Sequence, residues 1–254
     1  IHIAFDEVSD KAQLRGMRVT GAELVGLVPL HTLLSAGKHY LKKQERSTGV
    51  SDSELIKIAV KSMGLDDLYE FKAEEKIIEY LIEDRTTKKL VDMNLKEFAE
   101  ETASESPAPG GGSVSAYVGA MGVALGTMVS NLSAHKRGWD DRWEEFSIWA
   151  DKGQEFMKKL VAFVDEDTQA FNKIMDAFKL PNGNDAEKAI RKQAIQIATK
   201  YAIEVPFTVM ETAFSSMQVI LAMAKSGNPN SASDAGVGAL CACMAVKGAY
   251  LNVK

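Results

Sequence analysis

Apolar residues recur at intervals of three or four along most of the chain after about residue 93. Two long segments, at about 141–178 and about 184–227, keep this spacing for many turns, and the second begins with the capping pair Asn184 and Glu187. This spacing places apolar side chains on one face of an α-helix. Because no segment here alternates as a strand does, we predict an all-α helical bundle over residues 93–254.

Residues 113–134 carry no charge and are long enough to raise the possibility of a transmembrane helix. The segment holds too many hydroxyl and amide side chains for a span, and its glycines weaken an isolated helix. Ala116, Gly119, Ala120, Val123 and either Gly126 or Thr127 recur at helical spacing. One face is therefore nearly free of side chains and lets other helices approach closely. We predict the central helix of a bundle and no transmembrane segment.

The first 83 residues have a mixed pattern. A helix ends near Gly16, a β-rich run follows over residues 17–29, and another helix begins at the capping residue Ser51 and ends at Gly64. We predict an α+β fragment over 1–83, a polar linker over 84–92 and the helical unit over 93–254. One strand cannot form a sheet, so we expect partner strands in a longer protein, and a further helix after Lys254.

The composition excludes several classes of protein. Of 254 residues, 46% are hydrophobic and 26% charged, and a net charge of −5 gives no sign of nucleic-acid binding. Cys241 and Cys243 form neither a disulfide framework nor a zinc spacing, and the four histidines lack metal-ligand spacing. We expect a cytoplasmic protein without a metal site.

In the stretch "VDEDTQAF", a carboxylate occupies a position at which the spacing of the predicted helix calls for an apolar residue. The apolar stripe of this helix consists of Met157, Leu160, Val161, Val164, Phe171, Met175 and Phe178. At 100° per residue Asp167 lies inside the stripe, whereas Asp165 and Glu166 lie outside it. A carboxyl group turned into a bundle loses solvation, so its pKa rises and it can exchange protons near neutrality. The alternative is that Asp167 caps a neighbouring helix or pairs with a lysine.

Three glycines, Gly110 to Gly112, precede Ser113 at the start of the uncharged helix. A glycine loop at a helix N-terminus presents unobstructed N–H groups at the positive end of the helix dipole, which suits a carboxylate, a phosphate or a pterin edge. We expect Gly111 to tolerate no Cβ because the ligand approaches there. The alternative is a tight turn with close helix packing, in which an alanine would be forced to a positive φ.

A second polar turn, "SGNPNSASD", raises the same choice. Asn228, Ser233 and Asp234 either cap the helix that follows or face the glycine loop across a cleft.

Four stretches together resemble the cyclodeaminase domain of the formiminotransferase-cyclodeaminase family. They are "LKEFAEETASESPAPGGGSVSA", "VDEDTQAFNKIM", "EVPFTVMETA" and "SGNPNSASDAGVGA". Upstream, "VTGAELVGLVPLHTLLSAGKHYL" and "GLDDLYEFKAEEKIIEYLI" are similar to the end of the formiminotransferase domain. The resemblance implies a folate enzyme of histidine breakdown. Its first domain transfers a formimino group to tetrahydrofolate, and its second closes 5-formimidoyltetrahydrofolate to 5,10-methenyltetrahydrofolate with release of ammonia.

The resemblance also implies roles for residues. The family's catalytic aspartate falls on Asp167, with Asp165 as the alternative. The residues implied to hold the folate are Gly110, Gly111, Gly112, Ser113, Asn228, Ser233 and Asp234. No prosthetic group is implied, because tetrahydrofolate or its polyglutamylated form is the substrate. The family forms rings of dimers, so we expect a homo-oligomer. Transferase activity is not expected from this chain alone, because it lacks the subdomain that carries the transferase's catalytic histidine.

Two other functions stay open. One is a methenyltetrahydrofolate cyclohydrolase, an activity found on similar isolated domains, although the transferase-like stretch favours the cyclodeaminase. The other, of a different class, is a folate-binding assembly module without catalysis, because helices rich in small residues pack well between subunits. Ammonia release would separate the cyclodeaminase from both.

Overall fold

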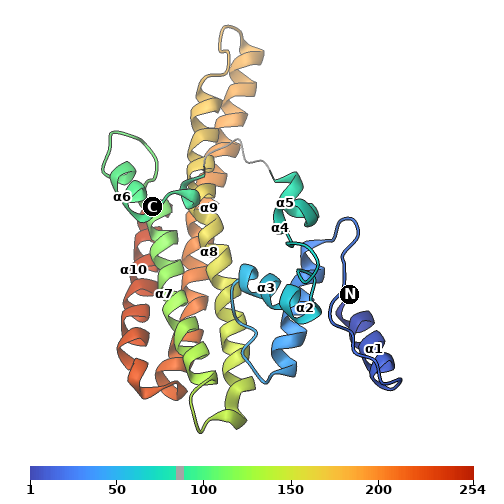
Figure 1. Ribbon diagram of the computed structural model, residues 1–254. Helices are drawn as coiled ribbons and strands as arrows, with labels where there is room; N and C mark the ends of the chain where they lie inside the picture. The colour runs from blue at the N-terminus through green and yellow to red at the C-terminus, as the bar shows by residue number, and fades with distance from the viewer. Residues whose placement is uncertain (84–88) are drawn as a thin grey trace. The chain divides into compact units, whose positions relative to one another are not determined.

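The computed structural model describes residues 1–83 and 89–254, and the regular elements of these residues are helices (Figure 1). In chain order they are α1 (His2–Gln13), α2 (Leu30–Lys43), α3 (Asp52–Met63), α4 (Ala73–Lys76), α5 (Ile78–Ile82), η1 (Leu90–Asp92), α6 (Leu95–Thr102), α7 (Gly111–Ala134), η2 (Asp140–Arg142), α8 (Trp143–Phe178), α9 (Asp185–Ser226), η3 (Pro229–Ser231) and α10 (Ala232–Val253). Residue contacts divide the chain into two compact units. The first is Ile1–Thr87 with Asn131–Asp151, and the second is Lys88–Ser130 with Lys152–Lys254.

The first unit is built around α2 and α3, which pack against each other. Leu33 of α2 and Met63 of α3 are almost fully buried in its core. Helix α3 begins where the Ser51 hydroxyl accepts the N–H of Glu54 at 3.3 Å, and it ends at Gly64, whose φ is +59°. Both ends lie where the capping residues predict them.

The β-rich run over residues 17–29 does not become a strand in the part of the chain that the structure describes. Val28 alone forms a parallel bridge, with Ile77. The Val28 N–H donates to the Lys76 carbonyl at 2.9 Å, and the Ile78 N–H donates to the Val28 carbonyl at 3.1 Å. The predicted α+β character is therefore not observed for these residues, because a single run has no partner strand with which to form a sheet. Val25, 88% exposed, shows how little covers the run.

Ser47 and Thr48 connect the two sequence ranges of the first unit through hydrogen bonds. The Thr48 N–H donates to the Ser147 hydroxyl at 2.9 Å, and the Thr48 hydroxyl donates to the Asp151 carboxylate at 2.5 Å. The Ser47 hydroxyl donates to Asn131 at 2.6 Å. Residues 131–151 therefore belong to the first unit by contact, although they follow the predicted linker in sequence. Residues 84–88 of that linker lie outside the described residues, and the boundaries 1–83, 84–92 and 93–254 stay a prediction.

Helix α7 packs as closely as its small residues predict. A Cβ on Gly119 would lie 3.0 Å from Ala245 of α10, one on Gly122 would lie 2.8 Å from the Gly238 carbonyl, and one on Gly126 would lie 3.1 Å from Ile220 of α9. Three buried hydroxyls of α7 donate to carbonyls one turn earlier: Ser115 to Gly111 at 2.7 Å, Thr127 to Val123 at 2.8 Å and Ser130 to Gly126 at 3.1 Å. The prediction of a bundle helix with a face of small residues is confirmed.

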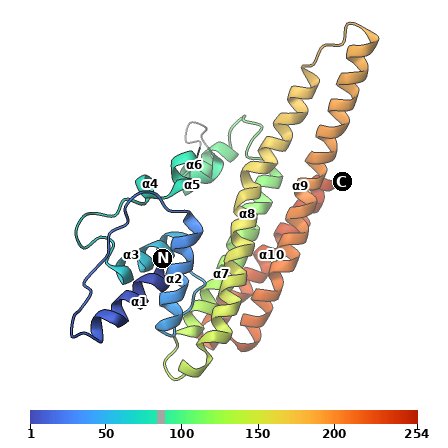
Figure 2. The same cartoon turned by 90° about the vertical axis from the view of Figure 1, so that its right-hand side faces the viewer.

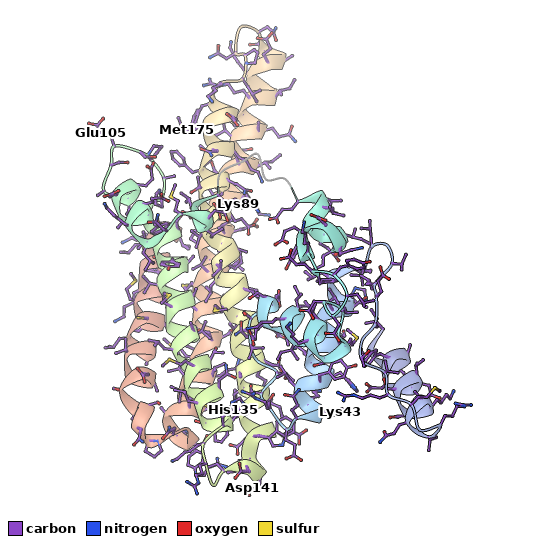
Figure 3. All side chains as sticks on the ribbon, viewed as in Figure 1. Lys43, Lys89, Glu105, His135, Asp141 and Met175 are labelled. Carbon is purple, nitrogen blue, oxygen red and sulfur yellow. The ribbon has the colours of Figure 1, made fainter. Side chains whose placement is uncertain are left out.

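Helices α8 and α9 run side by side beyond the start of α7, as both ribbon views show (Figures 1 and 2). The apolar stripe of α8 therefore has two halves. Leu160 and Val164 are buried, but Phe171, Met175 and Phe178 are 41%, 44% and 49% exposed. Met175 marks this uncovered part of α8 in Figure 3. The stripe loses its cover close to Asp167.

Within the part of the chain that the structure describes, three helical segments are long and apolar enough to cross a membrane by length and composition alone: Gly111–Ala134, Asp185–Ser226 and Pro229–Val253. The most apolar window of the first is 61% buried inside the structure, against 33% and 22% for the other two. Buried Ser113, Ser130 and Ser133 lie along the first segment. Its apolar character is thus used for packing between helices, whereas α9 and α10 keep broad exposed apolar surfaces.

Candidate functional site

Asp167 meets the start of α7 directly. Its Oδ2 accepts the backbone N–H of Ser113 at 2.9 Å and the Ser113 hydroxyl at 3.2 Å. The same hydroxyl contacts the Val164 carbonyl at 2.8 Å and so ties α7 to α8 one turn before the carboxylate. Among the described residues no hydrogen bond reaches Oδ1 of Asp167. The carboxylate caps α7 with one oxygen and leaves the other available for chemistry.

The Asp167 carboxylate leaves no room for a side chain at one glycine of the loop, Gly112. A Cβ on Gly112 would overlap Asp167, with Oδ2 2.6 Å away and Oδ1 closer still. A Cβ on Gly111 would lie 3.4 Å from the Asn252 amide, which is an ordinary contact, and one on Gly110 would meet only the Pro107 carbonyl at 3.8 Å.

The positive φ that the turn hypothesis expected in the loop is not observed, whereas the close helix packing that it also expected is observed at Gly112. The described residues with positive φ are Gly16, Gly26, Glu45, Gly64 and Gly138, and none belongs to the loop. The protein itself excludes a side chain at Gly112, and the expectation that a ligand excludes one at Gly111 stays a prediction.

Burial raises the pKa of Asp167 above its usual 3.8, while the two hydrogen bonds from Ser113 act in the opposite direction. Burial is the larger effect because the side chain lies between two helices. The direction agrees with the proton-exchange role that its place in the apolar stripe predicts.

The neighbouring acids have other partners. Oδ1 of Asp165 accepts the Leu90 N–H at 2.6 Å and so holds the start of η1. Glu166 accepts the Tyr201 hydroxyl of α9 at 2.8 Å, and this bond together with burial raises the pKa of Tyr201. Of the three acids, Asp167 alone faces the glycine loop, which favours it over Asp165 as the chemical group.

Asn228, Ser233 and Asp234 do not join this site within one chain. Asn228 accepts the Asn230 N–H at 3.2 Å and caps η3. A Cβ on the preceding Gly227 would lie 2.9 Å from Val129, near the far end of α7. Val129 is 18 residues beyond Gly111, about 27 Å along a helix. The expectation that these residues face the glycine loop of the same chain is therefore wrong, because α7 and α10 run antiparallel.

Asn252 is a site residue that the sequence did not suggest. Its side chain lies closest to Gly111, and its Nδ2 donates to the Gly248 carbonyl at 3.0 Å. No local pattern marks it, since the fold brings it to the loop from about 140 positions away.

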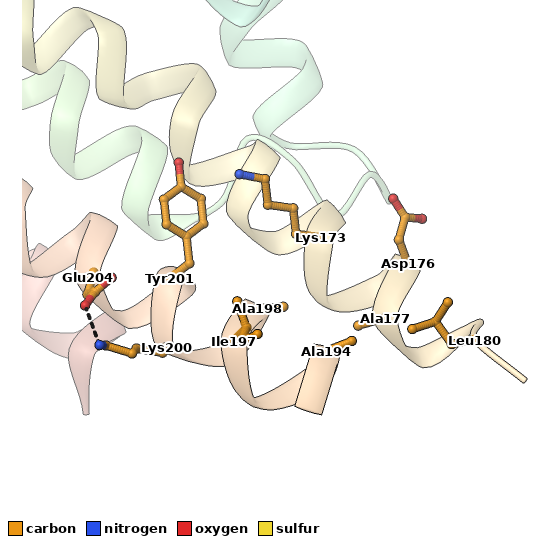
Figure 4. Close-up of a pocket in the computed structure, with 10 residues that line it drawn as sticks. All are labelled: Lys173, Asp176, Ala177, Leu180, Ala194, Ile197, Ala198, Lys200, Tyr201 and Glu204. Carbon is orange, nitrogen blue, oxygen red and sulfur yellow. Dashed lines mark ion pairs between the residues drawn. The ribbon is translucent and has the colours of Figure 1, made fainter. Parts of the chain in front are cut away.

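A cavity of about 800 Å³ lies between α8 and α9 (Figure 4). Lys173, Tyr201 and Glu204 line it, and Lys173 lies 3.9 Å from the centre of the Tyr201 ring. Neither Asp167 nor the glycine loop lines this cavity, so it is separate from the candidate site. In the described residues no cluster of three or more His, Cys, Asp or Glu side chains could hold a metal ion.

Comparison with known proteins gives matches along the whole chain. Residues 94–254 match the family described as formiminotransferase-cyclodeaminase, and residues 1–83 match the formiminotransferase domain. The chain is 37% identical to a formimidoyltransferase-cyclodeaminase of Gallus gallus over 254 residues, which is 100% of the chain and 47% of that relative. The chain thus spans about half the length of such curated relatives.

Two shorter proteins match the helical part. A methenyltetrahydrofolate cyclohydrolase of Methylorubrum extorquens is 35% identical over 159 residues, which is 63% of the chain and 76% of that protein. The crystal structure of a formiminotetrahydrofolate cyclodeaminase from Thermotoga maritima superposes with a TM-score of 0.56 at 32% identity. It covers 64% of the chain and 77% of that protein.

Proposed function

The chain belongs to the formiminotransferase-cyclodeaminase family, and from this premise we propose that its helical unit is a formimidoyltetrahydrofolate cyclodeaminase. It would convert 5-formimidoyltetrahydrofolate to 5,10-methenyltetrahydrofolate and ammonia. The observation that carries the proposal is the half-buried Asp167 carboxylate, held against a side-chain-free helix N-terminus by Ser113.

The reaction needs one group that accepts and then donates a proton. N10 of the folate attacks the formimino carbon, and N10 must lose its proton as the new bond forms. The formimino nitrogen must gain a proton, because it leaves as ammonia and not as an amide anion. Asp167 can take the proton from N10 and pass it to the departing nitrogen, and its raised pKa brings it closer to the pH at which it must do both. The proton count balances without any other acid or base when the formimino group enters as its protonated amidinium form, because its nitrogen then needs only the one proton from N10 to leave as ammonia.

The glycine loop supplies the complementary half of the site. The N–H groups of Gly111 and Gly112 lie in the first turn of α7, where the helix dipole is positive. They suit a carbonyl or anionic group of the folate, and the missing side chains let that group come close. With Ser113 and Asn252 these residues form the proposed folate contacts of one chain.

Ammonia release from 5-formimidoyltetrahydrofolate tests the proposal. Asp167→Asn keeps the size of the side chain and an oxygen for Ser113, but it cannot exchange the proton. We expect it to lower the rate at least 100-fold, the low end of the usual contribution of a general acid or base. Asp165→Asn is the matched control two residues away and should release ammonia at near the wild-type rate. Equal losses in both variants would contradict the assignment of Asp167.

The cyclohydrolase remains the second candidate, because a methenyltetrahydrofolate cyclohydrolase covers the same helical unit at 35% identity. The match of residues 1–83 to the formiminotransferase domain favours the cyclodeaminase, since a transferase would supply its substrate. Hydrolysis of methenyltetrahydrofolate without ammonia release from the formimidoyl compound would select the cyclohydrolase. Folate binding without turnover of either compound would select the assembly module.

We also propose that the protein acts as a homo-oligomer. Val237, Leu240, Met244 and Leu251 lie three, four and seven residues apart on α10 and are 50%, 72%, 42% and 74% exposed. Such a heptad stripe suits a helix of a second copy. An antiparallel contact between the two copies of α10 would carry the N-terminal end of one helix to the C-terminal end of the other.

This contact would give the second polar turn a role in the site. Asn252, at the C-terminal end of α10, lies beside the glycine loop. The N-terminal end of the partner's α10 would bring a second set of Asn228, Ser233 and Asp234 to that loop. The folate contacts that do not meet within one chain would then meet between two copies.

The names of the relatives and the match of residues 1–83 support a pairing of this activity with formimidoyl transfer. We propose a cytoplasmic location and a role in one-carbon transfer from histidine breakdown. The free thiols of Cys241 and Cys243 are consistent with a reducing compartment.

A further inference from the structure

The apolar stripe of α8 changes its environment at Asp167. Before this residue Leu160 and Val164 are almost completely buried, because α7 covers them. Asp167 meets the first turn of α7, and one turn later Phe171 is 41% exposed. Phe171 continues the buried stripe, but about two fifths of its surface remains exposed. This exposed apolar area is available for contact with a ligand.

The backbone across from Asp167 carries no side chain to provide that cover. Gly110, Gly111 and Gly112 lead into α7, and in the structure a Cβ on Gly110 would find its nearest neighbour, a backbone carbonyl, only at 3.8 Å. The glycine loop leads into the turn of α7 that bonds to Asp167, and Phe171 follows Asp167 by about one helical turn on α8. This spacing fits a planar group bonded directly to the reacting atoms.

We propose that Phe171 is the surface on which the p-aminobenzoyl ring of the folate rests during cyclisation. The inference rests on the proposed function and assigns a residue to one part of that substrate. The p-aminobenzoyl ring is bonded to N10, the atom whose proton Asp167 would accept. Phe171 lies four residues after Asp167 on the same face of α8, about 6 Å along the axis, so a ring attached to N10 reaches it without bending away.

The contact explains why the exposed residue is aromatic. Two flat rings pack in offset or edge-to-face arrangements with their centres about 4.5–7 Å apart, and they gain beyond the area they bury. A ring held there fixes the direction of the N10 lone pair toward the formimino carbon. Phe171 is therefore a positioning residue as well as a source of affinity.

Equilibrium binding of 5-formyltetrahydrofolate, which keeps both rings but has no nitrogen to release, tests the inference. Phe171→Ala should weaken binding about tenfold, as expected for loss of one aromatic contact, and Phe171→Tyr should restore it to within about twofold. The matched control is Phe207→Ala on α9. Phe207 is 43% exposed, like Phe171, and among the described residues it takes no part in the hydrogen bonds of Asp167 or in the close contacts of the glycine loop, so binding should not change.

The outcomes separate this inference from the proposed function. If the wild type binds the folate and Phe171→Ala binds it equally well, the proposed contact between Phe171 and the p-aminobenzoyl ring is wrong, and the proposed cyclodeaminase activity is unaffected. If the wild type binds no folate, both fail. If Phe171→Ala lowers the molecular mass in light scattering while its folate affinity is unchanged, the ring belongs to a subunit contact and the inference is overturned. A KM that rises about tenfold in Phe171→Ala, with Phe171→Tyr near wild type, would support it.

Discussion

Replacing Gly112 by alanine tests the arrangement around Asp167 most directly. The new Cβ would occupy the place of the Asp167 carboxylate, so one of the two must move. Helix α7 is fixed by its close contacts with α9 and α10, whereas the aspartate has rotatable bonds. We therefore expect the carboxylate to swing out toward water and to lose both hydrogen bonds from Ser113.

The cost follows from those two bonds. A hydrogen bond to a charged group contributes about 1.5–3 kcal/mol, and the lower end applies because Asp167 is half-buried and regains water when it moves. Alanine in place of glycine in a helix returns about 1 kcal/mol. We expect a net loss of about 2 kcal/mol in the free energy of unfolding. For a chain of this length that is a fall of about 4–8 °C in melting temperature.

Urea unfolding and the ammonia assay on one preparation give the result. Gly112→Ala should lose both stability and activity, because the displaced carboxylate no longer faces the glycine loop. Gly111→Ala is the matched control, since its Cβ would make only an ordinary contact with Asn252, and its stability should not fall but should rise by up to about 1 kcal/mol, the helix gain counted for Gly112. In an Asp167→Ala background the space is open, so Gly112→Ala should no longer destabilise the protein. The coupling between the two positions should then be about 3 kcal/mol, because the alanine gain of about 1 kcal/mol occurs in both backgrounds and cancels.

A Gly112→Ala protein with wild-type stability and full turnover would refute this geometry. If Gly112→Ala still lowers stability in the Asp167→Ala background, a clash with the carboxylate is not the cause of the loss. This result would mean that the glycine is needed for the helix and not for the carboxylate.

The remaining predictions concern the pH dependence, the second aspartate, the loop and the α10 surface. Burial raises the pKa of Asp167, so the contribution of this group to wild-type stability is lost as the pH rises from 3.8 through the folded-state pKa. Asp167→Asn cannot titrate, and its free energy of unfolding relative to wild type should therefore increase between pH 4 and pH 7 in urea unfolding. Asp165→Asn should lower the melting temperature while the rate of ammonia release stays near wild type, because Asp165 holds the Leu90 N–H; an unchanged melting temperature would contradict this role. Gly111→Ala should weaken folate binding without loss of stability if the ligand approaches that position, and unchanged affinity in a titration would remove Gly111 from the site. Leu240→Arg should reduce the molecular mass in light scattering, since it places a charge on the exposed stripe of α10, whereas an unchanged mass would place any subunit contact elsewhere.

The sequence alone determined the long helices of the second unit and the place of Asp167 on one of them. Periodicity placed Asp167 inside the stripe of a long helix and left Asp165 and Glu166 outside it, and the structure gives the latter two acids other partners. This prediction depends only on the 100° step of an α-helix, which is fixed by local geometry. The small residues of α7 predicted close packing for the same reason, since a face without side chains can be read from spacing alone.

The tertiary structure decided which residues meet. Sequence could not show that Gly112, and not Gly111, lies under Asp167, because that depends on how α7 and α8 are aligned along their length. It could not show that Asn252 reaches the loop or that Asn228, Ser233 and Asp234 lie at the other end of α7, because chain direction in a bundle is set by packing between helices. It also predicted a strand over residues 17–29 from β-rich composition, where the described chain forms a single bridge at Val28. A strand requires a partner, and a partner is a property of the fold that no local pattern contains.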